Sequence, residues 1–358
     1  MLRPRALATS AWSAAVVVAV GLAVTGCKVQ PSTPGPGPSS SPAPNATSSP
    51  ATSSPSAATE AGPLVIEPGA GFSPVYRLIK DARHSIDVTM YEFSDPTAEQ
   101  DLAAAAARGV RVRVVLDQRE QSENSSAYQY LTSHGVKVAW SWSRYEYTHQ
   151  KTVVIDETEA VIMTANLTSS YYSTSRDFLV VDSNPADIAA IVTVFDADFD
   201  HVPVTPGEGA DLVWSPTDSQ AKLLALINGA TSSLRIYSEE MGDTQVEDAL
   251  IGAAKRGVDV QVCGENEDGE YDDAYSRLAE AGVHISYYSS PDGFYIHGKV
   301  IEADYGTSHA KVFIGSENFS GTSLDSNREL GLIISDPAVL SAIAGTFAAD
   351  FRAGQRWR

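Results

Sequence analysis

The sequence contains two copies of the pattern His-x-Lys-x4-Asp, formed by His149, Lys151 and Asp156 and by His297, Lys299 and Asp304. The two histidines are 297 − 149 = 148 residues apart. Histidine can serve as a nucleophile or as an acid near neutral pH, and a lysine beside it supplies positive charge for an anionic oxygen. The two copies therefore predict one site of acid–base chemistry on an anion, built from two similar halves.

The similarity between the halves extends beyond these motifs. Residues 79–82 and 108–110 recur 148 positions later, as 227–230 and 256–258. After the motif aspartate the offset becomes 152, which relates Asn166 to Asn318 and the pairs Arg176-Asp177 and Arg328-Glu329. A repeat held over this length indicates duplication of one folding unit. The change of offset predicts an insertion of four residues in the second copy, within 305–311.

Hydrophobic periodicity predicts alternating strands and helices in both halves. The expected strands are 85–91, 110–116, 136–140, 152–155, 160–164 and 178–181, then 234–238, 258–263, 284–288, 299–302, 311–314 and 330–333. The expected helices are 98–107, 126–133 and 186–199, then 220–228, 245–254, 273–281 and 339–351. This order is typical of an α/β protein with mixed sheets covered by helices on both faces. We expect repeat 1 to span 63–205 and repeat 2 to span 206–358, joined by a linker at 200–214.

The N-terminal segment 1–62 is expected to lie outside the fold. Residues 1–26 have a basic start and a short apolar run, as a secretory signal has, and they end before Cys27 in a sequence that resembles a bacterial lipobox. Residues 27–62 are rich in Pro, Ser, Thr and Ala, a composition that predicts a disordered tether. We therefore expect an extracytoplasmic lipoprotein, anchored in the cell membrane through lipidated Cys27.

Composition restricts the possible partners and cofactors. The formal net charge is −20, which argues against general nucleic-acid binding, because that needs a basic surface. The chain has two cysteines, so lipidation of Cys27 leaves no intrachain disulfide, and Cys263 is expected in the core at the end of a strand. No motif predicts a metal site or another cofactor. We expect a monomer.

Two histidines, two lysines and two asparagines suit a phosphodiester. One histidine attacks phosphorus, the other protonates the leaving oxygen, and the remaining donors hold the non-bridging oxygens.

These residues resemble the phospholipase D superfamily, whose signature is a pair of His-x-Lys-x4-Asp motifs, each followed by a segment like Gly-Ser-x-Asn. The second copy has that segment complete, at 315–318, whereas the first reads Thr164-Ala165-Asn166. We therefore expect a hydroxyl group to be missing from one side of the site. The resemblance covers 71–351 and implies two α-β-α sandwich halves related by a pseudo-twofold axis.

The resemblance also implies roles for individual residues. His149 would be the nucleophile, forming a phosphohistidine, and His297 the general acid and then the base. The six motif residues form the candidate catalytic set, within which Asp156 and Asp304 are expected to brace the motif loops. Phosphate would be held by the two lysines together with Asn166, Asn318 and Ser316. The histidine rings would be oriented by Asp177 and Glu329. Independently of the resemblance, the offset of 148 relates Glu92 to Glu240, and we expect both at strand ends facing the site.

The function expected from this resemblance is hydrolysis, or transfer, of the head-group phosphodiester of a phospholipid. Two alternatives remain open at this stage, a surface-anchored metal-independent nuclease and a phosphate-binding module without activity.

Overall fold

The computed structural model describes residues 64–289 and 293–358. The predicted signal segment, the tether and Cys27 lie outside this range. In the part of the chain that is described, no helix combines the length and apolar character needed to cross a membrane.

The first half forms a mixed sheet in the order β4-β3-β2-β5-β6-β7-β1. Its strands are β1 (Leu64–Glu67), β2 (Ser85–Met90), β3 (Arg111–Leu116), β4 (Lys137–Trp140), β5 (Thr152–Ile155), β6 (Glu159–Met163) and β7 (Ser175–Asp182). Strands β2, β3 and β4 run parallel, and the other neighbours are antiparallel.

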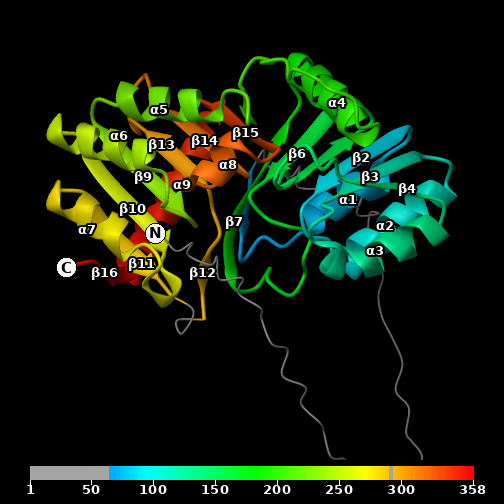
Figure 1. Cartoon of the computed structure of the whole chain (residues 1–358), viewed down its shortest axis with the longest axis horizontal. Helices are drawn as coiled ribbons and strands as arrows, with labels where there is room; N and C mark the ends of the chain where they lie inside the picture. The colour runs from blue at the N-terminus through cyan, green and yellow to red at the C-terminus, as the bar shows by residue number, and fades with distance from the viewer. Residues whose placement is uncertain (1–63, 290–292) are drawn as a thin grey trace, which may run out of the picture. The chain divides into compact units, whose positions relative to one another are not determined.

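The second half repeats this order, as β11-β10-β9-β13-β14-β15-β8, with β16 added beside β11. Its strands are β8 (Leu212–Ser215), β9 (Ser233–Ser238), β10 (Asp259–Glu265), β11 (His284–Tyr288), β13 (Val300–Ala303), β14 (Lys311–Gly315), β15 (Glu329–Ile334) and β16 (Gln355–Arg356). Strand β12 (Tyr295–Ile296) leaves this half and pairs with β7 of the first. The predicted fold class, two related α/β halves with mixed sheets, is confirmed (Figure 1).

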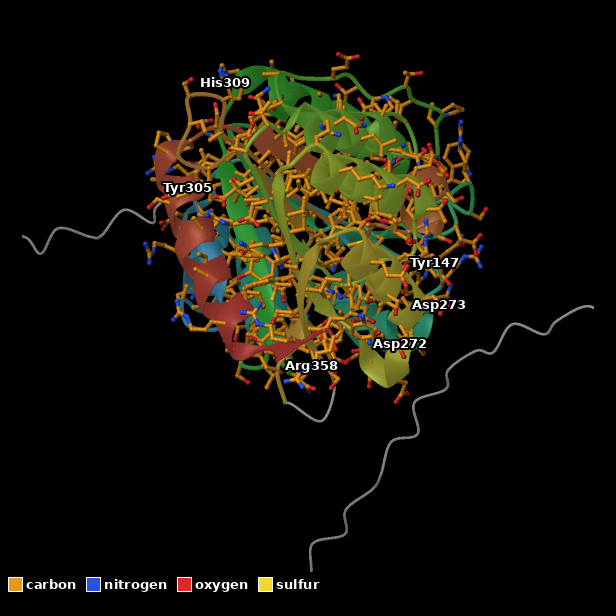
Figure 2. The ribbon with its side chains drawn as sticks, turned by 90° about the vertical axis from the view of Figure 1, so that its left-hand side faces the viewer. Tyr147, Asp272, Asp273, Tyr305, His309 and Arg358 are labelled. Atoms are coloured by element: carbon orange, nitrogen blue, oxygen red, sulfur yellow. The ribbon has the colours of Figure 1, made fainter. Side chains whose placement is uncertain are left out.

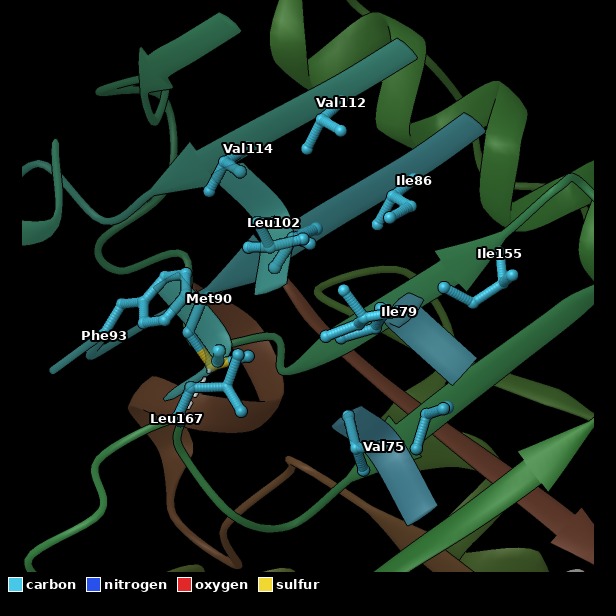
Figure 3. Packing of buried hydrophobic residues seen from close by; sticks show 14 of the residues in the cluster. Val75, Ile79, Ile86, Met90, Phe93, Leu102, Val112, Val114, Ile155 and Leu167 are labelled. Atoms are coloured by element: carbon cyan, nitrogen blue, oxygen red, sulfur yellow. Dashed lines mark hydrogen bonds between the residues drawn. The ribbon is translucent and has the colours of Figure 1, made fainter. Parts of the chain in front are cut away.

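Helices lie on both sides of each sheet. They are α1 (Ser73–Asp81), α2 (Pro96–Ala107), α3 (Gln121–Ser133) and α4 (Pro185–Phe199) in the first half, and α5 (Ser219–Gly229), α6 (Thr244–Lys255), α7 (Asp272–Glu280), α8 (Gly321–Asp325) and α9 (Pro337–Ala353) in the second, with a short 3-10 turn at Glu267–Gly269. One core cluster joins α1 and α2 to β2 and β3 (Figure 3). A second cluster contains residues of both sheets together with α4 and α9, so burial of apolar surface joins the two halves.

Matching capping residues start equivalent helices. The Asp95 side chain accepts hydrogen bonds from the first turn of α2, and Asp243, its equivalent at the same offset as the two motif histidines, does the same for α6. Asn184 and Asp336, which are equivalent at the later offset, cap α4 and α9, and Pro is the first residue of both helices. An N-cap oxygen satisfies backbone N–H groups that have no partner within the helix. The repeat therefore preserves where helices begin as well as where side chains face.

The change of offset has the predicted cause. Three residues connect β5 to β6, whereas seven connect β13 to β14, from Asp304 to Ala310. The difference is the predicted insertion of four residues. Figure 2 shows Tyr305 and His309 in this loop, away from Tyr147, which precedes His149.

Other expectations about elements were wrong or incomplete. The predicted linker 200–214 overlaps β8, whose Trp214 is fully buried and pairs with Leu330 of β15. The short elements β1, β12, β16 and α8, and helix α1, were not predicted. Cys263 is buried in the core, as expected.

Candidate active site

Each motif histidine contacts a carboxylate from the other half of the chain. Nδ1 of His149 lies 2.8 Å from Oε2 of Glu329, and Nδ1 of His297 lies 2.7 Å from Oδ1 of Asp177. The first pair is separated by 180 residues of sequence and the second by 120. A carboxylate on Nδ1 fixes the ring orientation and leaves Nε2 free for chemistry. The two motifs therefore share one site in which each half completes the other.

Short exchanged segments produce this crossing. Strand β12, which leads into His297, runs parallel to the start of β7 and pairs Ile296 with Arg176, next to Asp177. On the other side, the backbone N–H groups of His149 and Gln150 both donate to the carbonyl oxygen of Arg328, next to Glu329. Each histidine is thus attached by backbone hydrogen bonds to the strand that carries its carboxylate partner.

Two arginines, Arg328 fully buried and Arg176 partly buried, hold these strands to the opposite half. Arg328 forms an ion pair of 2.8 Å with Asp198 on α4, and Arg176 forms one of 2.7 Å with Asp350 on α9. The two pairs are related by the offset of 152 in both members, so they belong to the repeat. The sequence showed the repeated Arg-acid pairs but not that the arginines reach across the interface.

The two lysines are buried beside their own histidines. Nζ of Lys151 donates to the His149 carbonyl oxygen at 2.6 Å, and Nζ of Lys299 donates to that of His297 at 2.6 Å. Burial is the largest effect on Lys151 and lowers its pKa to about 7. The positive charge of Lys299 also lowers this pKa, whereas the negative charge of Glu329 raises it. Lysines from both halves therefore interact electrostatically within one site.

Hydrogen bonds and nearby lysines keep the carboxylates ionised. Burial opposes ionisation of Asp177 and Glu329, but their contacts with His297 and His149, together with the charges of Lys299 and Lys151, outweigh it, so the pKa of each carboxyl group is lowered. Burial lowers the pKa of His149, and Glu329 opposes that shift. A neutral His149 with Nδ1 bound to a carboxylate presents an unprotonated Nε2, which is the form a nucleophile requires.

The motif aspartates bind backbone N–H groups. Asp156 accepts hydrogen bonds from the N–H groups of 83–85, which precede β2, and Asp304 accepts them from 231–233, which precede β9. Both aspartates have positive φ angles, of 51° and 55°. Burial opposes ionisation of Asp304, yet these donors outweigh it and lower its pKa to about 2. These contacts suit bracing of the motif loops.

The two asparagines are paired with the glutamates at the strand ends. Nδ2 of Asn166 lies 3.2 Å from Glu92, and Nδ2 of Asn318 lies 2.9 Å from Glu240. Burial raises the pKa of Glu240 to about 7 and also raises that of Glu92. Each amide nitrogen has a second hydrogen, so a phosphate oxygen can still be bound there.

The expected loss of a hydroxyl group from the first half was wrong. Thr164 occupies the place of Ser316 at the later offset of the repeat. The N–H of Phe178 donates to Thr164 Oγ1 at 2.9 Å, as the N–H of Leu330 donates to Ser316 Oγ at 3.1 Å. Thr164 also donates to Asp177 at 2.6 Å. Both hydroxyls thus bind the strand that carries a histidine-orienting carboxylate, and comparison by residue type rather than by identity would have found Thr164.

One site residue was not predicted. Glu239 forms an ion pair with Lys299, and its Oε1 lies 3.6 Å from Nε2 of His297. The equivalent position in the first half, 239 − 148 = 91, is Tyr91. The Tyr91 ring lies 4.6 Å from the His149 ring, and Lys151 Nζ is 5.1 Å from the Tyr91 centroid. The sequence could have indicated this residue, because Glu239 is next to Glu240, which the repeat had already placed at a strand end near the site.

Metal ligands are not clustered in the described part of the chain. Across residues 64–289 and 293–358, no three His, Cys, Asp or Glu side chains are arranged to hold a metal ion.

Comparison with known proteins places these halves in a family. The profile described as "Cardiolipin synthase, PLD-like domain" matches residues 75–202 and 223–351, one match in each half. The chain belongs to this phospholipase D-like family. Members of the superfamily cleave or transfer phosphodiesters. The two matched regions contain both histidines, both lysines and both crossed carboxylates.

Curated relatives match a little more than a third of the chain. Mitochondrial cardiolipin hydrolase of Xenopus tropicalis is 28% identical over 133 residues, which is 37% of this chain and 61% of that protein. The Homo sapiens protein of the same name is 26% identical over 127 residues, which is 36% of this chain and 50% of that protein. The matches thus span one half to three fifths of these relatives.

Solved structures share the fold of both halves. Phosphatidylserine synthase of Haemophilus influenzae has a TM-score of 0.61 at 13% identity, covering 79% of this chain and 84% of that chain. Polyphosphate kinase of Porphyromonas gingivalis has a TM-score of 0.64 at 17% identity, covering 81% of this chain and 50% of that chain. At these identities the likeness concerns the phospholipase D-like fold alone.

Proposed function

We propose that this protein hydrolyses the head-group phosphodiester of a phospholipid, or transfers the phosphatidyl group to another alcohol, through a phosphohistidine. The observation that carries the proposal is the crossed pair of contacts, His149 with Glu329 and His297 with Asp177. It supports two histidines with oriented rings in one site, which a two-step displacement at phosphorus requires.

In the first step, Nε2 of His149 attacks phosphorus. The bond from phosphorus to the head-group oxygen breaks, and the proton on Nε2 of His297 passes to that oxygen, which leaves as an alcohol. In the second step, Nε2 of His297 takes a proton from water or from an acceptor alcohol, whose oxygen attacks phosphorus. The bond from phosphorus to His149 breaks, and both histidines return to their starting forms.

The anionic oxygens on phosphorus would be held by Lys151 and Lys299, with Asn166 and Asn318 as neutral donors. Preorganised positive charge in a water-poor site stabilises the transition state strongly. We assign Ser316 to the same set as a donor held beside the site by its contact with the backbone of Leu330. Asp156 and Asp304 would act through the motif loops.

Membrane lipid as the substrate class is supported by the relatives, which are cardiolipin hydrolases, and by the net charge of −20, which disfavours nucleic acid. We further propose that the protein is a monomer on the extracytoplasmic face, attached by lipidated Cys27, with 27–62 as a tether and with 63–205 and 206–358 as the two repeats.

The test offers vesicles of cardiolipin, phosphatidylglycerol or phosphatidylcholine, and in parallel single-stranded DNA, to the full-length protein in the presence of a metal chelator. We expect release of the head group or formation of a transphosphatidylation product, with DNA left intact. His149→Ala and His297→Ala are expected to lower turnover by at least about 1,000-fold, because residues that act as a unit each remove most of the catalysis.

Cleavage of DNA alone would replace the lipid proposal with a nuclease. Binding of phosphate without turnover of any substrate would leave a phosphate-binding module. Near-normal turnover by either alanine variant would exclude the two-histidine mechanism.

A further inference from the structure

The surroundings of the two histidines differ in charge at one position of the repeat. In the second half, a carboxylate lies beside the histidine and the lysine, because Glu239 contacts both Lys299 and Nε2 of His297. In the first half, the equivalent residue is Tyr91, whose ring packs edge-on against His149. The crossed carboxylates, the lysines, the asparagines and the arginines are otherwise repeated in both halves.

Glu239 is fixed where it can interact with the reactive nitrogen. Its Oε1 accepts a hydrogen bond of 2.9 Å from the Tyr295 hydroxyl, and its other oxygen contacts the ammonium of Lys299. Burial opposes ionisation of Glu239, but His297 and Lys299 outweigh it and lower the pKa of this carboxyl group. Glu239 is therefore an anion held against the nitrogen that would deliver the proton.

The two histidines consequently have different partners on their two nitrogens. His297 has Asp177 at 2.7 Å from Nδ1 and Glu239 at 3.6 Å from Nε2. At 3.6 Å, the contact between Glu239 and Nε2 of His297 is an ion pair rather than a well-formed hydrogen bond. His149 has Glu329 on Nδ1, and among the described residues no carboxylate forms an ion pair with its Nε2. Each ring nitrogen of His297 therefore faces a carboxylate oxygen, whereas only one ring nitrogen of His149 does.

We propose that Glu239 is a positioning residue that holds a proton on Nε2 of His297 before substrate binds, an inference that rests on the proposed two-histidine reaction. His297 then begins the cycle as the acid, and His149 begins it as the nucleophile. During the first step that proton passes to the leaving oxygen, and Glu239 stays ionised throughout. The asymmetry of the two roles comes from the Tyr91–Glu239 difference, because the remaining machinery is duplicated.

The difference between Tyr91 and Glu239 allows a direct test by exchange. Full-length protein is mixed with bis(p-nitrophenyl) phosphate, a phosphodiester whose good leaving group lets the covalent intermediate accumulate. The reaction is quenched in alkali, which preserves phosphohistidine, and the modified peptide is identified by mass spectrometry. The variants are Glu239→Gln, Glu239→Tyr and the exchange Tyr91→Glu/Glu239→Tyr, each with its thermal unfolding midpoint measured.

Wild-type protein is expected to carry the modification on His149. Both single variants are expected to divide it between His149 and His297, with at least a tenth on His297. The exchange variant is expected to carry most of it on His297. Asn166→Ala is the matched control, because it alters the phosphate site and leaves both Tyr91 and Glu239 unchanged. In this variant the covalent modification is expected to stay on His149.

Modification that stays entirely on His149 in every variant would overturn the role of Glu239 and leave the proposed function intact. Modification of His297 in the wild type would overturn the assignment of roles. Absence of covalent modification from all variants, including the wild type, would remove the phosphohistidine mechanism and this inference with it. If the exchange variant does not fold, the two single variants still decide the outcome.

Discussion

At the residue scale, Lys151 gives the candidate site a dependence on pH. Its pKa of about 7 means that the ammonium loses its proton near neutrality, far below the ordinary range for lysine. The charged form binds an anion and the neutral form does not. Affinity for a phosphodiester should therefore be highest below pH 7 and fall as the pH rises through that value.

Dimethyl phosphate is a suitable ligand for this prediction, because it keeps a single negative charge across the range. We expect its dissociation constant, measured by competitive inhibition or calorimetry, to rise about 10-fold between pH 6 and pH 8.5, as loss of one charge pair predicts. Lys151→Met should bind weakly at every pH. An equal pH dependence in wild type and Lys151→Met would assign the effect to another group.

The carboxylates that contact the histidines provide the second prediction at this scale. Asp177→Asn and Glu329→Gln keep the shape of the side chain but remove its charge. Each should lower kcat about 10–100-fold, as loss of an orienting partner does, with a smaller change in KM. Steady-state kinetics on the preferred lipid measure this. A large rise in KM at constant kcat would indicate a binding role instead.

At the scale of elements, the buried Arg328–Asp198 pair should hold β15 against α4 of the other half. Arg328→Met leaves Asp198 buried without its partner, which is expected to lower the free energy of unfolding by about 3–5 kcal/mol. Arg328→Met/Asp198→Leu should recover most of that loss, because it removes both charges. Denaturant titration at pH 7 measures both variants.

A surface ion pair serves as the control for this prediction. Arg119 and Glu146 are 3.1 Å apart, with side chains 46% and 45% exposed. Glu146→Gln should change the free energy of unfolding by at most about 1 kcal/mol. If Arg328→Met is no more destabilising than Glu146→Gln, the buried pair does not fix the interface.

The elements that sequence reasoning found are those with a strong local pattern. Strands such as Thr152–Ile155 and helices such as Pro185–Phe199 follow from apolar period and capping residues. Helix α1 was missed because only Val75 and Ile79 are buried in it. Strand β8 was missed because proline and glycine precede it, and because its strand character depends on pairing with β15, a contact that no local pattern encodes.

The site shows the same limit at longer range. The repeat placed His149, Lys151 and their counterparts in one reaction centre, since matched residue types at a fixed offset imply matched positions. It did not show that Glu329 contacts His149, because the partners are 180 residues apart in sequence. It also left Glu239 unnoticed, because this position differs between the halves and a search for matches passes over differences.

At the scale of the whole molecule, the crossed contacts imply one active site in each chain. Both histidines and both carboxylates come from the same chain in the described structure, and neither half contains both a motif histidine and the carboxylate that contacts its Nδ1. A mixture of His149→Ala and His297→Ala proteins should therefore remain inactive, below about 1% of wild-type turnover, because no molecule in it has both histidines.

If two chains instead exchanged halves, mixed dimers would carry an intact site, and co-expression of the two variants would restore up to about a quarter of the activity. Co-expression with two affinity tags, purification of any species that carries both, and assay on lipid vesicles measure this directly. Restored activity in a doubly tagged species would show that sites form between chains, and its absence would support a monomer in which the duplication itself supplies both halves of the reaction centre.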